Sequence, residues 1–274
     1  MTGGKSVHID IEFESEVFMP ESASSLLSSA IEYLLFQRHQ IPFVFQTFKY
    51  MTSKWSIQED NTYETFHLEK QRRLALSTLN EVNDLCEHIR RECKHNNILS
   101  ARIIFGATPL TPKEIYVVKL PKVSKQHSVD NHLKSVTTAT NKVLMKLLTC
   151  EQLYQAFSRN IGTTNMYLDI ETLDSTSGDC ENFQIKEDFD LSHKCPVIHI
   201  NLVHKTPTLT DNNCCRDIAV FESISELNLS EKVETVEEGV VDKNQTDNVL
   251  WKEAKVFIRG FKDVFVKGRS IWED

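Results

Sequence analysis

The 274-residue sequence is poor in glycine, and its 8 glycines are not clustered into a phosphate-binding loop. Neither GxGxxG nor GxxxxGK[ST] occurs, which excludes the common nucleotide-binding loops. The HExxH and GxSxG signatures of zinc peptidases and serine hydrolases are also missing. These absences predict a protein that is not an enzyme, needs no cofactor and works by binding other proteins.

Long apolar runs are missing as well. No run approaches the roughly 20 residues of a membrane-spanning helix, and Met1–Lys5 shows no apolar signal-peptide segment. The formal net charge is −8, and no basic face is visible in the sequence, which disfavours a nucleic-acid partner. We therefore expect neither a membrane nor nucleic acid as partner.

The cysteine pattern does not indicate a metal site. Seven cysteines without a secretory signal indicate a reducing compartment. Cys86 and Cys93 continue an apolar helical stripe, and the adjacent Cys214 and Cys215 have no second CxxC with them. A hydrolase that uses Cys150 or Cys195 remains a distant alternative, because a partner base would have to come from elsewhere in the fold.

One apolar stripe organises the chain. Between Ser128 and Phe157 its members recur in steps of three and four, which predicts one continuous helix roughly 40 Å long. They are Leu133, Val136, Thr140, Val143, Leu147, Cys150, Tyr154 and Phe157. A second ribbon, Leu144, Met145 and Leu148, lies beside the stripe. Either the helix is buried on two sides, or this flank receives a partner.

The remaining patterns predict an α+β domain with helices on one face of a sheet. Further helices are expected over 22–38 and 70–95, with a short one in 43–55. Strands are expected at 7–18, 98–105, 115–120, 165–173, 197–204, 215–221 and 251–261. Two acidic pairs, Asp10 with Glu12 and Asp169 with Glu171, fit the solvent side of their strands.

The segment 222–248 carries eight acidic residues and two lysines. Such a composition predicts a solvated, disordered insertion. The folded core is then expected at about 7–221 and 249–263 of a single domain that takes up 1–274.

Three stretches together resemble one family. Phe36–Pro42 (FQRHQIP) is similar to its Gln-Arg-x-Gln-aliphatic-Pro signature. Ile103–Gly106 and Thr111–Tyr116 (TPKEIY) resemble its hairpin, and the end from Trp251 to Phe261 resembles its closing strand, Trp-x-x-Ala-x-Val-x-Phe-Lys-Gly-Phe. The family is comet, whose HORMA-domain proteins bind the spindle-checkpoint protein Mad-two.

The resemblance implies a HORMA fold: a central, mostly antiparallel sheet, three helices on one face and a C-terminal safety belt. Binding of closed Mad-two is implied at the central helix and the end of the first helix. The residues that correspond to this surface are Gln37, Val143, Leu144 and Leu148. The helical period points Val143 inward, so Leu144 is the expected anchor.

The resemblance also implies delivery of Mad-two to a hexameric AAA+ ATPase of the Pch-two type, which would silence the spindle assembly checkpoint in mitosis. The ATPase-facing motif Phe-x-Pro-Lys matches Phe183, Ile185 and Lys186, with isoleucine in place of proline. The belt residues would be Trp251, Val256, Gly260 and Phe261. The implied location is nucleus and cytoplasm, with spindle or kinetochore association. The alternative within the fold is an adaptor of the meiotic axis or of repair that clasps a partner peptide.

Overall fold

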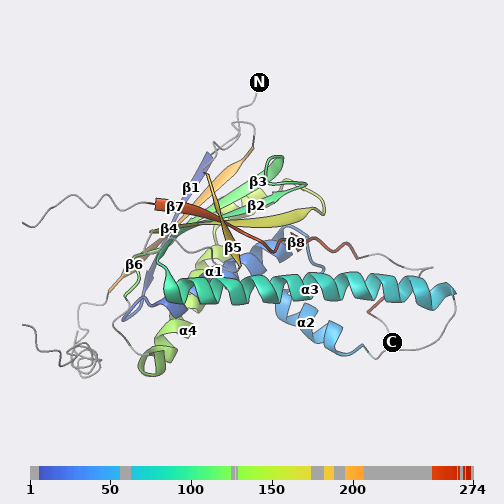
Figure 1. Ribbon diagram of the computed structural model, residues 1–274, viewed down its shortest axis with the longest axis horizontal. Coiled ribbons are helices and arrows are strands. Elements are labelled where there is room, and N and C mark those ends of the chain that lie inside the picture. The colour runs from blue at the N-terminus through green and yellow to red at the C-terminus, as the bar shows by residue number, and fades with distance from the viewer. Residues whose placement is uncertain are drawn as a thin grey trace, which may run out of the picture.

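The computed structural model describes residues 6–55, 63–124, 127, 129–173, 182–187, 195–206, 249–263, 265, 268 and 270–272. One eight-stranded sheet lies on a layer of helices (Figure 1). The α+β class and the placing of the helices on one face are therefore confirmed. Among the described residues, no helix is long and apolar enough to cross a membrane.

The described residues form five helices and eight strands. The helices are α1 (Pro20–Gln37), α2 (Phe45–Ser53), α3 (Tyr63–His95), α4 (Val129–Leu148) and α5 (Glu151–Phe157). The strands are β1 (Ser6–Glu14), β2 (Ile98–Gly106), β3 (Pro112–Lys119), β4 (Asn165–Leu173), β5 (Phe183–Lys186), β6 (Val197–Lys205), β7 (Val249–Ala254) and β8 (Ile258–Arg259).

The sheet has the order β1-β6-β3-β2-β4-β7-β5, and β8 pairs with β4. Only β6 makes parallel pairings, with β1 and with β3, so the sheet is mostly antiparallel as expected. The last long strand, β7, lies between β4 and β5 although β5 and β6 both precede it in the chain. Strands β6 and β7 therefore lie near opposite edges of the sheet.

The helical layer has α1 in its middle, in contact with α3 on one side and α4 on the other. Helix α1 starts at a proline, which suits the first helical position because the missing N–H would have no partner there. It buries Leu26, Leu27, Ile31, Leu34 and Leu35 in the core. Helix α3 has 33 residues and extends beyond the edge of the sheet (Figure 1).

The stripe that was predicted on the second long helix is confirmed. Its residues Ala75, Leu79, Val82, Ile89 and Cys93 are buried on α3, and its remaining member, Cys86, is half-buried. The helix starts at Tyr63, seven residues before the predicted start, and Leu68, which lies two turns before Ala75, continues the stripe and packs against the core.

The prediction of one continuous helix over 128–157 is wrong. Helix α4 ends at Leu148 and α5 begins at Glu151, because Cys150 has an extended backbone, with ψ of 108°. The break changes which residues face inward: Leu153 is buried, whereas Tyr154 is 76% exposed. Leu133, at the other end of the stripe, is also exposed, and the neighbouring His132 is buried instead.

The C-terminal strand is also split. Strand β7 ends at Ala254, and two residues of β8 follow after a bend, so Val256 lies outside both strands. Beyond them the chain packs against α2 and its flanks: Ile271 is fully buried, and the Trp272 ring stacks on Trp55 with centroids 5.0 Å apart. The predicted strand at 215–221 and the acidic segment 222–248 lie outside the described residues.

Candidate functional site

The outer face of α4 carries an apolar surface. Met145 is 60% exposed and Leu148 is 55% exposed, while Leu144 is half-buried at the edge of the core. Val143 is only 2% exposed and packs in the core, so it cannot offer its side chain to a partner and its inclusion among the binding residues is not supported. The second ribbon of the sequence is thus the side of α4 that faces away from the core.

Contacts with α1 fix the position of this surface. Ser25 and Thr140 share a hydrogen bond between their hydroxyl groups (3.1 Å), and the Tyr33 hydroxyl donates to the Leu147 carbonyl (3.3 Å). From the first pair to the second, the residue number increases in both helices, so α1 and α4 run parallel. Gln37 follows Tyr33 by one helical turn on the same side, and it is half-buried.

The parallel arrangement places three of the four predicted residues, Gln37, Leu144 and Leu148, at similar heights on two neighbouring helices. Tyr33 and Leu147 lie at the same height along the two helix axes. At about 1.5 Å per residue, Gln37 is then displaced along the axes by about 10 Å from Leu144, and Leu148 lies between the two. The other side of α4 meets β1, where Lys142 donates to the Glu14 carbonyl and Lys146 to the Glu12 carbonyl. These lysines cover part of a sheet edge that would otherwise be open to another strand.

The three sequence motifs meet at one junction below the β2–β3 hairpin. Arg38, from the first motif, forms a buried ion pair with Glu114, from the second (2.7 Å). The guanidinium also donates to the Phe157 carbonyl (3.1 Å), and burial raises the pKa of the Glu114 carboxyl. Removing one partner would leave a buried charge uncompensated, which is costly.

The third motif reaches the same junction through the backbone. Gln40 receives a hydrogen bond on its side-chain oxygen from the Thr164 amide (2.7 Å), and its carbonyl receives one from the Phe261 amide (2.7 Å). Gly260 leaves no room for a side chain, since a Cβ would lie 2.5 Å from both the Gln40 Oε1 and the Thr164 carbonyl oxygen. The motif residues therefore have structural roles: they connect the end of α1 to the β2–β3 hairpin and to the C-terminal segment.

The C-terminal residues assigned to a belt are placed in different surroundings. Trp251 lies in β7 under the guanidinium of Arg102, which is 3.9 Å from the ring centroid. Val256 is half-buried after the strand. Phe261 is buried, and its ring lies 6.3 Å from that of Phe48.

The three residues matched to the ATPase motif lie on β5, at the edge of the sheet next to β7. Phe183 is almost fully buried, so its assignment as a contact residue is not supported, whereas Ile185 is 51% exposed. Lys186 forms ion pairs with Asp169 (3.1 Å) and Glu253 (3.4 Å). Asp169 was expected on the solvent side of its strand, and it is fully buried instead.

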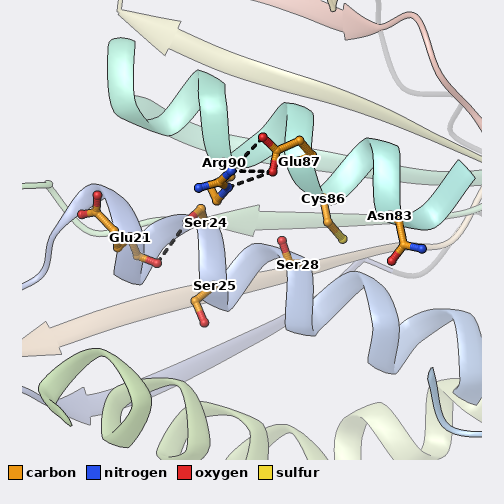
Figure 2. A pocket seen from close by; sticks show the side chains of 8 residues that line it. All are labelled: Glu21, Ser24, Ser25, Ser28, Asn83, Cys86, Glu87 and Arg90. Carbon is orange, nitrogen blue, oxygen red and sulfur yellow. Dashed lines mark hydrogen bonds and ion pairs between the residues drawn. The ribbon is translucent and has the colours of Figure 1, made fainter. Parts of the chain in front are cut away.

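A shallow groove separates α1 from α3, on the side of α1 away from α4 (Figure 2). It is lined by Glu21, Ser24, Ser25, Ser28, Asn83, Cys86, Glu87 and Arg90. Several of its polar groups bind one another: Arg90 pairs with Glu87 (2.7 Å), and the Ser24 hydroxyl donates to the Glu21 carbonyl (3.1 Å). Burial raises the pKa of the Cys86 thiol to about 11, so this thiol is not activated.

The two cysteines proposed as alternative nucleophiles lie in different environments. Burial raises the pKa of Cys195 to about 11, which keeps its thiol protonated at neutral pH. Cys150 is half-buried at the break between α4 and α5. Among the described residues, no three histidine, cysteine or acidic side chains gather to hold a metal ion.

Sequence reasoning did not assign all exposed apolar side chains of this region. Met145 belongs to the second ribbon, but it was not included among the binding residues. Tyr154 is exposed only because the helix breaks before it, and the unbroken repeat gave no signal of that break.

Comparisons with known proteins agree with the resemblance seen in the sequence. The model of the p31comet family, described as "Mad1 and Cdc20-bound-Mad2 binding", matches residues 15–221. The "MAD2L1-binding protein" of Mus musculus is 24% identical over 106 residues, which are 38% of this chain and 38% of that protein. The family match begins just after β1 and includes α1, the hairpin, α4 and β6, and the chain belongs to the p31comet family.

Proposed function

We propose that this protein binds the closed conformer of Mad2 through the outer face of α4 and covers the surface that Mad2 uses to dimerise. The observation that supports this most directly is the apolar surface formed by Leu144, Met145 and Leu148. The opposite side of the same helix is buried in the core, whereas Met145 and Leu148 leave more than half of their side chains in solvent. Gln37 would contribute a polar contact beside them.

The proposed mechanism is competition followed by remodelling, with no catalysis by this chain. Large apolar side chains at the centre of an interface supply most of the binding free energy, and a polar rim supplies specificity. A protein that occupies this face of closed Mad2 prevents further Mad2 from binding there. We propose that it then presents Mad2 to a Pch-two-type AAA+ ATPase, which would silence the spindle checkpoint in the nucleus and cytoplasm of mitotic cells.

The ATPase contact would be made by the exposed part of β5. Ile185 is the outward side chain there, and Lys186 keeps part of its side chain accessible. An Ile185→Asp variant should lose capture by the ATPase while it still binds Mad2. Capture equal to that of the unaltered chain would contradict this contact.

The position of the C-terminal strand also supports a closed belt that forms without a bound partner peptide. Strand β7 lies between β4 and β5. We propose that this strand of the chain itself takes the place that a partner peptide would take in an open belt. This favours the Mad2-binding function over an adaptor that clasps partner peptides. The raised pKa of Cys195 disfavours this cysteine as the nucleophile of a hydrolase.

A pair of matched substitutions tests the surface. Leu148→Asp places a charge in the centre of the proposed contact, and Leu110→Asp makes the same change at the 82% exposed tip of the β2–β3 hairpin. Binding to closed Mad2 should weaken at least about tenfold in the first variant and stay unchanged in the second. Equal binding by both variants, with unchanged folding, would overturn the assignment of this face.

A further inference from the structure

Lys186 reaches across a whole strand. In the sheet, β7 lies between β5 and β4, with Lys186 opposite Trp251 and with Glu253 opposite Asp169. The Lys186 ammonium is 3.2 and 3.1 Å from the two carboxylate oxygens of Asp169 in β4. It is also 3.4 Å from the Glu253 carboxylate in β7. One side chain of the edge strand thus connects three strands and passes over the one in the middle.

The buried carboxylate of Asp169 needs nearby cations to stabilise its charge. Asp169 is fully buried on the face of the sheet away from the helices, and this burial raises the pKa of its carboxyl. Arg102 also faces it, at 3.9 Å, and stacks over the ring of Trp251 in the same strand as Glu253. Lys186 is the closer cation and the only one of the two that comes from β5.

Among the described residues, β5 is a short strand with one neighbouring strand. It has four residues and pairs with β7 alone at the edge of the sheet. Phe183 anchors its start in the core, Gln184 and Ile185 are exposed, and Lys186 is its last residue. The end of the strand is therefore held by its backbone pairing and by the ion pairs of Lys186.

We propose that Lys186 is a latch that retains the C-terminal strand. Its ammonium, held by Asp169 and Glu253, keeps β5 paired with the outer edge of β7. It thereby helps to keep β7 seated against β4, where the buried ion pair of Lys252 with Glu92 (2.9 Å) also holds it. Without the latch, β5 separates from the sheet, β7 leaves its place, and the slot between β4 and β5 accepts an extended peptide. This role is independent of the α4 surface and of any Mad2 binding.

Hydrogen exchange on the full chain tests the latch. The variants are Lys186→Met, Asp169→Asn, the two combined, and Lys205→Met as a control. Lys205 also pairs with a carboxylate, Glu12 (2.6 Å), but this pair joins the neighbouring strands β6 and β1 and crosses no strand. The amides of 249–254 should exchange at least about tenfold faster in Lys186→Met and in Asp169→Asn, while β2 and β3 keep their protection.

The control and the double variant separate a latch from general destabilisation. Lys205→Met should leave the exchange of β7 unchanged. If Lys186→Met does not fold, the double variant, which leaves no buried carboxylate unpaired, should fold and still show fast exchange in β7. Protection of β7 equal to that of the unaltered chain, or an equal loss in β2 and β3, would overturn the latch.

A labelled peptide with the sequence of residues 249–263 provides the second readout. It should bind the Lys186→Met chain and not the unaltered chain or Lys205→Met. Failure of the peptide to bind a Lys186→Met chain whose β7 exchanges fast would overturn the proposal that the freed slot accepts a peptide. Equal binding to all three chains would overturn the role of Lys186.

Discussion

The hydroxyl of Tyr33 in α1 donates a hydrogen bond to the main-chain carbonyl of Leu147 in α4, across 3.3 Å. The bond lies at the last turn of α4, where the Leu147 carbonyl also accepts a longer hydrogen bond from the Cys150 amide (3.4 Å). It sets the position of α4 beside α1, and with it the relative placement of Leu148 and Gln37. The proposed binding surface is thus built from two helices that are hydrogen-bonded to each other.

Removal of this bond should have a small, measurable effect. In Tyr33→Phe the ring remains and only the hydroxyl is lost, so the free energy of unfolding should fall by about 1 kcal/mol. Urea denaturation followed by circular dichroism measures it. An unchanged midpoint would mean that packing alone sets the position of α4.

The ion pair between Arg38 and Glu114 should contribute far more than an exposed one. Arg38→Met leaves a buried carboxylate without its cation and should lower the free energy of unfolding by about 3–5 kcal/mol. In Arg38→Met combined with Glu114→Gln, part of this loss should be recovered, because no buried charge is left unpaired. Urea denaturation of the three chains gives the coupling.

The exposed pair Arg73 and Glu69 supplies the control for that series. Its members are four residues apart on α3, with much of both side chains in solvent. Arg73→Met should change the free energy of unfolding by less than about 0.5 kcal/mol. If both arginine substitutions had the same small effect, the proposed importance of the junction would be wrong.

A side chain at position 260 should disturb the same junction. In Gly260→Ala the new Cβ meets the Gln40 Oε1 and the Thr164 carbonyl oxygen at 2.5 Å, and neither can move without loss of its hydrogen bonds. The expected destabilisation is about 1–3 kcal/mol, as in other overpacked sites. Thermal unfolding measures it, and an unchanged transition temperature would show that Gly260 is not packed tightly against Gln40 and Thr164.

Acidic pH should weaken the pairing of β1 with β6. The rings of His8 and His199 stack at 4.5 Å, and partial burial together with the charge of His8 lowers the pKa of His199. The unfolded chain therefore takes up this proton at a higher pH than the folded chain. This contribution to stability is complete above the ordinary value of about 6.5 and is lost as the pH falls below it.

The measurement is the urea midpoint at about pH 7.5 and about pH 5.5 for the unaltered chain and for His199→Gln. The difference between the two pH values should be smaller in the variant, because the variant has no imidazole at this position to take up a proton. Equal differences would show that the stacked pair does not affect stability in this range.

Local patterns in the sequence were sufficient to predict much of the fold. The alternation in β1, the hairpin of β2 and β3, and the stripe of α3 depend on neighbours within the same element, and all three were predicted correctly. The apolar ribbon beside the main stripe of α4 was visible for the same reason.

Features that depend on distant parts of the chain were not predicted. The stripe continues through Cys150 without interruption, yet the backbone is extended there. Asp169 has the spacing of a solvent-facing residue, and its contacts with Lys186 and Arg102 show how its carboxylate can be buried. The docking of Trp272 on Phe43 and Trp55 joins segments more than two hundred residues apart, which no local pattern reveals.

The most direct test of the proposed function is a calorimetric titration of the unaltered chain with Mad2 locked in its closed form and, separately, in its open form. Binding to the closed form should be at least about tenfold tighter, since a mimic of the Mad2 dimer partner distinguishes the two forms. Equal affinity for both forms, or no binding to either, would contradict the proposed recognition of closed Mad2.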